Sequence, residues 1–119
     1  MAATYYTLTG VHRGNGDLSA AKRYAEEALP LLQRLGLRRI EGLLLYQLTV
    51  VYIELGDYQL AMAYALQSIE LLRSVRDNLN CAYALLRLGD LYQKFSRPEQ
   101  SQIVWQEALE CQSNETHPT

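Results

Sequence analysis

The sequence predicts an all-α protein: a right-handed α-solenoid of three helix-turn-helix repeats, with six main helices. Two properties of the composition favour helices. Hydrophobic residues make up 49% of the 119-residue chain, enough for a packed core, whereas 7 glycines and 3 prolines are too few for the many turns of an all-β protein. A third observation, an internal repeat, predicts that the helices form a solenoid.

A block of 40 residues is repeated along the chain. Residues 2–41 align without a gap with residues 42–81, and the dipeptide Gly16-Asp17 returns as Gly56-Asp57. Further identical pairs are Tyr6/Tyr46, Leu8/Leu48, Thr9/Thr49, Val11/Val51, Ala21/Ala61, Tyr24/Tyr64, Ala25/Ala65, Leu31/Leu71 and Leu32/Leu72. Residues 82–112 form a third, weaker copy, so residues 1–112 are predicted to be one solenoid, followed by a polar, disordered tail at 113–119.

Each repeat is predicted to hold two helices joined by a tight turn. In the second repeat, apolar residues recur at helical spacing before Gly56 and again after Asp57. Glycine ends a helix because it adopts the left-handed conformation without steric cost, and an aspartate accepts hydrogen bonds from the first N–H groups of the next helix. Small residues such as Ala61 and Ala65 let the paired helices approach closely.

The first and third repeats each depart from this pattern. Pro30 lies late in the second helix of the first repeat and is expected to kink or loosen its last turn. In the third repeat, Ser96 and Arg97 replace the Gly-Asp pair. There Ser96 is expected to cap the following helix, Pro98 suits its first turn, and Glu99 complements the helix dipole.

The order of residues within the repeats resembles the tetratricopeptide repeat, whose pattern is W-x2-L-G-x2-Y, then A-x3-F, then P. The matching positions are Leu45, Leu48, Thr49, Tyr52, Ala61 and Ala65 in the second repeat, Leu85, Leu88, Gly89, Tyr92, Ser101 and Trp105 in the third, and Tyr5, Leu8, Thr9, His12, Ala21 and Ala25 in the first. The resemblance covers about residues 2–112. The period of 40 residues, against about 34 in the common form, is similar to the long repeats of kinesin light chains, G-protein-signalling-modulator scaffolds and bacterial regulators.

The resemblance implies a non-catalytic function, in which the first helices of the repeats line a concave groove that binds a peptide or helix of another protein. The groove positions that it implies are Ala3, Tyr6, Gly10, Arg13, Leu43, Tyr46, Gln47, Val50, Ile53, Tyr83, Leu86, Arg87, Asp90 and Gln93. Most are apolar or aromatic, which disfavours capture of a C-terminal carboxylate by basic residues and suits an amphipathic helix. Alternatively, Leu43, Val50 and Ile53 pack only against neighbouring helices.

The end of the array suggests an alternative function. A terminal repeat normally needs a polar capping helix, because its last hairpin otherwise exposes the face that would stack on a further repeat. No such helix is predicted after the third repeat. The chain is then either a segment of a longer array or a homo-oligomer that associates through Ile103, Trp105 and Leu109.

Other classes of function are disfavoured. A net charge of −2 argues against a nucleic-acid platform. His12 and His117 have no nucleophile arranged with them, and no phosphate-binding glycine loop occurs, so no enzyme, cofactor or metal site is expected. Cys81 and Cys111 lack Cys-x-x-Cys spacing and are interpreted as two small buried apolar residues rather than a disulfide or a metal site, which favours a reducing, intracellular compartment. With neither a signal peptide nor a membrane span in view, the cytoplasm is the expected location.

Overall fold

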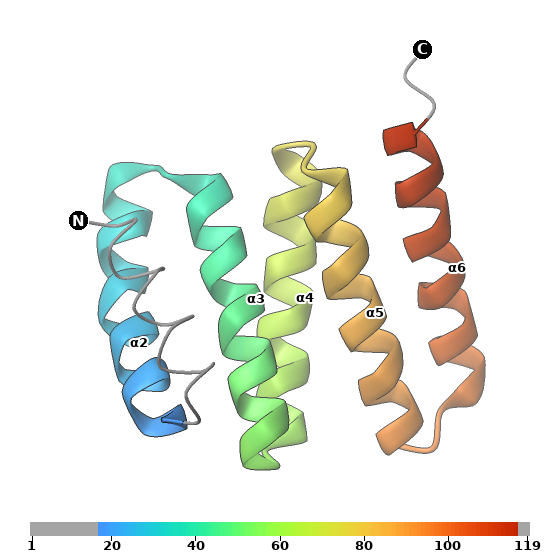
Figure 1. Cartoon of the computed structure of the whole chain (residues 1–119), viewed down its shortest axis with the longest axis horizontal. Coiled ribbons are helices and arrows are strands. Elements are labelled where there is room, and N and C mark those ends of the chain that lie inside the picture. Colours follow the sequence, from blue (N-terminus) through green and yellow to red (C-terminus); the bar gives the residue numbers. More distant parts are fainter. Residues whose placement is uncertain (1–16, 117–119) are drawn as a thin grey trace.

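The computed structural model describes residues 17–116. This part of the chain consists of five helices joined by short loops, and it contains no strand (Figure 1). The helices are α2 (Leu18–Leu35), α3 (Arg38–Leu55), α4 (Tyr58–Ser74), α5 (Asn78–Lys94) and α6 (Pro98–Thr116). The all-α prediction is confirmed for these residues. The sixth predicted helix, before Gly16, lies outside the described residues, together with Tyr6 and Arg13.

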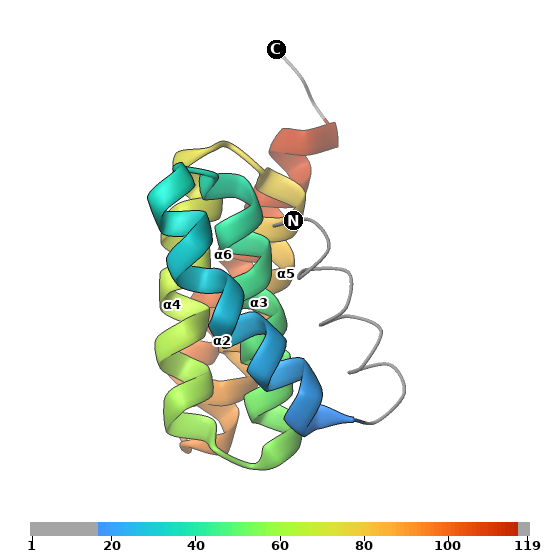
Figure 2. The same cartoon turned by 90° about the vertical axis from the view of Figure 1, so that its left-hand side faces the viewer.

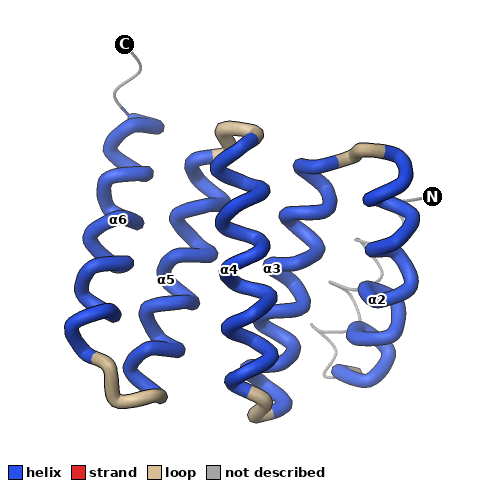
Figure 3. Tube along the Cα trace, turned by 180° about the vertical axis from the view of Figure 1, so that it is seen from behind, coloured by secondary structure: helices blue, strands red, loops and turns tan. Residues whose placement is uncertain are grey.

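Each helix packs against the next one along the chain. α3 and α4 form one antiparallel hairpin, α5 and α6 form a second, and α2 packs against α3 (Figure 1). α3 also contacts α5. Figure 2 shows α4 on one side of the molecule with α3 and α5 on the other, and Figure 3 shows the short loops between consecutive helices. The described helices therefore form a two-layered stack in which α3 and α5 share one face.

The loop between α3 and α4 has the geometry predicted for the Gly-Asp pair. Gly56 has a φ of 85°, in the left-handed region. The Oδ1 atom of Asp57 accepts a hydrogen bond from the N–H of Leu60 at 3.2 Å. Asp17 caps α2 in the same way, by accepting from the N–H of Ala20 at 3.1 Å. The glycine ends one helix, and the aspartate satisfies a free N–H group of the next.

The loop between α5 and α6 corrects the prediction for Ser96. The residue directly before α6 is Arg97, whereas Ser96 has a φ of 57° and occupies the left-handed position that Gly56 holds one repeat earlier. Pro98 begins α6 and Glu99 lies in its first turn, as predicted. The turn therefore needs a left-handed residue at this point, and a side chain there strains the backbone where a glycine would not.

Two helix ends differ from the sequence-based expectation. α2 continues as one helix through Pro30 to its end at Leu35. Ala28 and Leu32, on either side of the exposed proline, have no exposed surface, so packing holds this turn in place although one backbone N–H is missing. α6 runs on to Thr116, into the segment that the sequence predicts to be a polar tail.

Small buried residues allow the helices to lie close together. Ala21 and Ala25 of α2, and the corresponding Ala61 and Ala65 of α4, have no exposed surface. Larger side chains fill the space between the layers: Leu32, Leu44, Leu48, Leu72, Leu85, Leu88 and Leu91 are all buried. The same small and large positions are thus buried in successive repeats, as the repeat pattern predicts.

Buried serine hydroxyls connect the two helices of each hairpin. Ser68 of α4 donates to the backbone oxygen of Gly42 in α3 at 2.8 Å, and Ser101 of α6 donates to that of Gly89 in α5 at 2.9 Å. Both acceptors are glycines, which carry no side chain that would separate the helices. These bonds satisfy polar groups that burial would otherwise leave unpaired.

Tyr52, the tyrosine of the repeat motif, joins three helices. Its hydroxyl donates to Glu26 Oε1 of α2 at 2.5 Å, and its ring stacks on that of Tyr64 in α4, with centroids 5.5 Å apart. Lys22 of α2 lies over the same ring, with its Nζ 5.7 Å from the centroid. Burial, together with the hydrogen bond to Glu26, raises the pKa of Tyr52 above its ordinary value. The tyrosine therefore couples α2 to the hairpin that follows it.

Replacing Ser96 by glycine is expected to stabilise the protein. A residue with a side chain is strained in the left-handed conformation, whereas glycine is not. Ser96→Gly should therefore raise the free energy of unfolding by about 0.5–1 kcal/mol. The measurement is urea denaturation followed by circular dichroism. Gly56→Ala is the matched control and should lower the same quantity by about 1 kcal/mol. A lower denaturation midpoint for Ser96→Gly would contradict this reading of the turn.

Tyr52→Phe is expected to change how stability depends on pH. Because the folded-state pKa of Tyr52 is raised, the unfolded chain loses this proton first, and the free energy of unfolding should fall as pH rises above about 10. The variant should lose about 1 kcal/mol at neutral pH, for the missing hydrogen bond, and show a shallower decline in alkali. Urea denaturation at a series of pH values measures both effects; an unchanged alkaline slope would show that Tyr52 does not cause it.

Candidate functional site

The strongest candidate for a functional surface is the face that α3 and α5 share. Tyr46 and Ile53 project from α3, and Tyr83, Leu86 and Asp90 project from α5. Residues three, four or seven positions apart lie on the same side of a helix, so each set forms a stripe along its helix. Because α3 and α5 are in contact, the two stripes run next to each other.

A first hollow lies between these stripes. It has a volume of about 310 Å³ and is lined by Tyr46, Tyr83, Leu86, Arg87 and Asp90. Tyr83 is 42% exposed and Leu86 is 37% exposed, although both are large and mainly apolar side chains. The hollow therefore presents aromatic and aliphatic surface to solvent beside one positive and one negative group.

A second hollow continues from the first towards the C-terminal end of α5. Its volume is about 650 Å³, and its lining residues are Ile53, Arg87, Asp90, Gln93, Lys94 and Trp105. Arg87 and Asp90 line both hollows, so the two are contiguous. We call this continuous surface the α3/α5 face.

The charged groups on the α3/α5 face are held by few intramolecular contacts. The Nε of Arg87 donates to the hydroxyl oxygen of Tyr46 at 3.4 Å, a long hydrogen bond that links α5 to α3. The Nζ of Lys94 lies 5.3 Å from the centroid of the Tyr58 ring. Asp90 is exposed, and it lies between Arg87 and Lys94 in the sequence. An arginine has five N–H donors and a lysine has three, so both retain capacity for a further partner.

The structure brings together half of the groove residues implied by the sequence. Tyr46, Ile53, Tyr83, Leu86, Arg87, Asp90 and Gln93 line the two hollows. Val50 and Gln47 do not: they are only 4% and 8% exposed. Leu43 is half-buried and packs against the core. These residues are buried because α3 packs against both α2 and α4, and a helix between two neighbours buries more than one stripe of residues.

Two lining residues were not among the implied groove positions. Lys94 lies in the last turn of α5, where a basic residue also suits the helix dipole. Trp105 comes from α6 and was assigned to self-association, but it is half-buried and reaches the second hollow. Ile103 and Leu109, assigned to the same role, are 60% and 58% exposed. Trp105 could have been recognised from the repeat motif, in which both Gly89 and Trp105 are motif positions of the third repeat.

Gly89 makes room for the Trp105 ring. A Cβ atom added at Gly89 would lie 2.1 Å from Nε1 of Trp105, far inside van der Waals contact. The tryptophan therefore packs directly on the backbone of α5. This close approach places part of a large aromatic ring at the edge of the second hollow.

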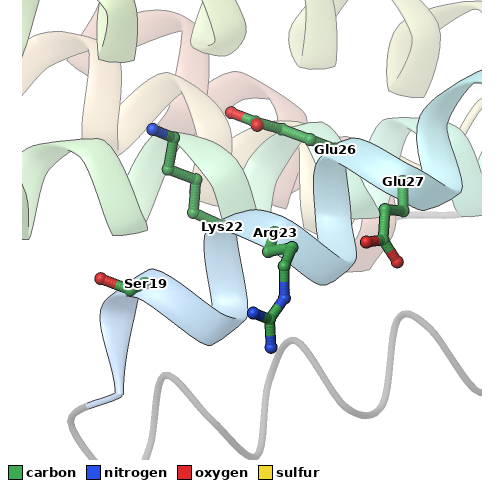
Figure 4. A pocket seen from close by; sticks show the side chains of 5 residues that line it. All are labelled: Ser19, Lys22, Arg23, Glu26 and Glu27. Carbon is green, nitrogen blue, oxygen red and sulfur yellow. The ribbon is translucent and has the colours of Figure 1, made fainter.

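A further hollow lies on α2, and two of its side chains, Lys22 and Glu26, contact Tyr52. Its volume is about 360 Å³, and Figure 4 shows its lining residues Ser19, Lys22, Arg23, Glu26 and Glu27, all from one helix. Glu26 accepts the Tyr52 hydrogen bond, and Lys22 lies over the Tyr52 ring. These charged groups belong to the joint between α2 and α3, so the hollow adds no separate chemistry.

Within residues 17–111, no three His, Cys, Asp or Glu side chains come together as a metal site would require. None of the helices in the described part of the chain has the length and apolar character needed to cross a membrane. Both histidines lie outside the described residues.

Comparison with known proteins identifies the repeat. Residues 44–71 match the family model of the tetratricopeptide repeat. The chain carries a tetratricopeptide repeat. The match covers most of α3, the Gly56-Asp57 turn and most of α4, and it confirms the resemblance seen in the sequence. In this repeat, Tyr52 and the alanines at 61 and 65 are the motif residues that pack between helices.

Solved structures share the fold over almost the whole chain. One similar structure is that of BtubC (BKLC) from P. vanneervenii, with a TM-score of 0.86 and 17% sequence identity. The alignment covers 99% of this chain and 50% of that one, so the chain spans about half the length of BtubC. At this identity the likeness shows a common fold. A search of curated proteins found no match to the sequence.

Gly89→Ala is expected to destabilise the α5/α6 hairpin. The new methyl group would overlap the Trp105 ring, and this overpacking should outweigh the helix propensity gained from alanine, for a net loss of about 1–2 kcal/mol in the free energy of unfolding. Thermal and urea denaturation measure the loss. In a Trp105→Ala background the same substitution should be neutral or stabilising. An equal loss in both backgrounds would place the strain elsewhere.

Proposed function

We propose that the α3/α5 face binds a peptide or a helix from a partner protein, without catalysing a reaction. The observation that carries this proposal is the pair of contiguous hollows, with Tyr83 and Leu86 exposed at the rim of the first. Tetratricopeptide repeats generally mediate protein–protein interactions, and the family match at residues 44–71 supports the same class of function here.

The chemistry of the face suits an amphipathic partner. Covering exposed tyrosine and leucine side chains with an apolar surface is energetically favourable. Aromatic residues are also enriched among those that contribute most to binding. Arg87, Asp90 and Lys94 stand beside this apolar patch and can fix the orientation of a polar or charged side chain. An amphipathic helix supplies both kinds of group on one side.

The proposal includes a first repeat at residues 2–41, giving six helices in a right-handed solenoid. The support is α2, which has the buried pattern of a second helix in a repeat. Its residues Ala21, Ala25 and Leu32 are fully buried, as are Ala61, Ala65 and Leu72 at the corresponding places in α4. A first helix preceding α2 would extend the α3/α5 face with Tyr6 and Arg13.

A specific observation favours self-association as a second candidate function. Leu109 of α6 corresponds, one repeat later, to Ile69 of α4. Ile69 is only 6% exposed and lies at the contact with α5, whereas Leu109 is 58% exposed. The site that α5 occupies on α4 is therefore open on α6. A helix of another repeat or of a second copy could cover it.

A binding experiment with selected peptides tests the main proposal. Peptides from a random displayed library are selected on the purified chain, and their affinities are measured by fluorescence anisotropy. Leu86→Ala and Tyr83→Ala/Leu86→Ala should weaken binding about tenfold or more, because they remove exposed apolar surface at the rim. The matched control is Leu60→Ala on α4, because Leu60 is 37% exposed, as Leu86 is, and lines neither hollow.

Two outcomes would reject peptide binding at this face. The first is equal affinity of the selected peptides for the wild type and the Tyr83→Ala/Leu86→Ala variant when circular dichroism shows both folded. The second is competition between the peptides and self-association, with Leu109→Ser abolishing both while the rim variants abolish neither. Light scattering at increasing protein concentration follows the association and distinguishes the two candidate functions.

A further inference from the structure

The two cysteines lie opposite each other across the α5/α6 hairpin. The hairpin turns at Ser96, and Cys81 and Cys111 are equally far from it along the chain, 15 residues before and 15 after. The register agrees with the contacts near the turn, where Ser101 bonds to Gly89 and Trp105 packs on the same glycine. Antiparallel helices in this register place the two thiols at the same level.

The two side chains reach the same part of the core from neighbouring helices. Cys81 is buried, with its Sγ 4.0 Å from the backbone oxygen of Ile69, and Cys111 packs against the same core from α6. The Cys111 thiol is near enough to Cys81 to raise the pKa of that thiol. Both cysteines are free thiols.

The helices of the preceding hairpin show how close the backbones come at this level. A Cβ atom added at Gly42 of α3 would lie 3.4 Å from the Cβ of Leu71 in α4. Leu71 is the counterpart of Cys111 one repeat earlier, and Gly42 directly follows the counterpart of Cys81. This contact belongs to the position next to that of Cys81, and it shows how closely the two helices of a hairpin approach at this level; a disulfide needs Cβ atoms about 3.5–4.5 Å apart.

We propose that Cys81 and Cys111 form an oxidation-sensitive pair that closes a disulfide between α5 and α6. With hydrogen peroxide as the oxidant, the half-buried Cys111 thiolate attacks one peroxide oxygen, the O–O bond breaks, and a sulfenic acid and water result. The Cys81 thiolate then attacks the sulfenic sulfur, the S–O bond breaks, and a second water leaves. In sum, two thiols and one hydrogen peroxide give one disulfide and two waters.

The surroundings assign the two steps to different cysteines. Burial and the neighbouring Cys111 raise the pKa of the Cys81 thiol to about 11, and Arg73 of α4 opposes this shift. Cys81 therefore carries little thiolate at neutral pH and acts as the resolving thiol, while the more accessible Cys111 meets the oxidant first. Arg73 also pairs with Glu107 of α6, at 3.2 Å, so α4 and α6 both contribute charge near the pair.

The disulfide would strengthen the least supported helix of the stack. Among the described helices, α6 packs closely only against α5, and one exposed ion pair, Arg73–Glu107, links it to α4. A bond between Cys81 and Cys111 would fasten α6 far from the turn at Ser96, where side-chain packing and the exposed Arg73–Glu107 pair hold it. Oxidation would thus fix the exposed α6 surface that carries Leu109.

The test treats the purified full chain with a small excess of hydrogen peroxide. The expected result is a loss of two hydrogen atoms in the intact mass, a disulfide between the Cys81 and Cys111 peptides, and a higher midpoint of thermal unfolding. Dithiothreitol should reverse all three. Cys81→Ser should instead accumulate the sulfenic acid of Cys111, which dimedone traps, and its midpoint should not rise on oxidation.

Three results would overturn the proposal. They are added oxygen on Cys111 in the wild type without loss of two hydrogens, a disulfide that forms only between two chains, and an intrachain bond that leaves the unfolding midpoint unchanged. Because these readouts come from the wild-type chain, they hold even where a cysteine variant folds poorly. They also do not depend on whether the α3/α5 face binds a peptide.

Discussion

The close packing of each helix on small residues of the next is the constraint on which the rest of the structure depends. None of these helices can bury its apolar side alone, and each does so only against its neighbours. Ala21, Ala25, Ala61 and Ala65 leave no surface exposed, so the helix axes come near enough for leucines to interdigitate. The closest approach is at Gly89, where the Trp105 ring packs on the backbone of α5.

The α3/α5 face follows from this packing. In each complete hairpin, the first helix lies on one side and the second on the other, so stacking the hairpins brings α3 and α5 together. Their outward stripes then form one surface with two connected hollows. Arg87, at the junction, reaches across to Tyr46 and belongs to both.

Repeat symmetry made much of this fold predictable from the sequence. The helices, the Gly56-Asp57 turn and the face bearing Tyr46, Tyr83 and Leu86 all follow from positions that recur every 40 residues. Symmetry failed where one repeat differs from another. Ser96 was read as a cap from its side chain, although its place in the turn demands the left-handed geometry of Gly56. Val50 was implied in the groove, but it is buried because α3 has neighbours on more than one side.

The sequence alone determined the class of structure, because helical periodicity, turn residues and small residues at fixed spacing are local properties that act within one repeat. Only the tertiary structure decided which exposed positions join into one surface. The α2 to α3 joint through Glu26 and Tyr52, the reach of Trp105 into the second hollow and the packing of Cys81 and Cys111 at the same core all involve residues far apart in the chain. Such contacts depend on helix register and rotation, which packing sets and a repeat pattern does not contain.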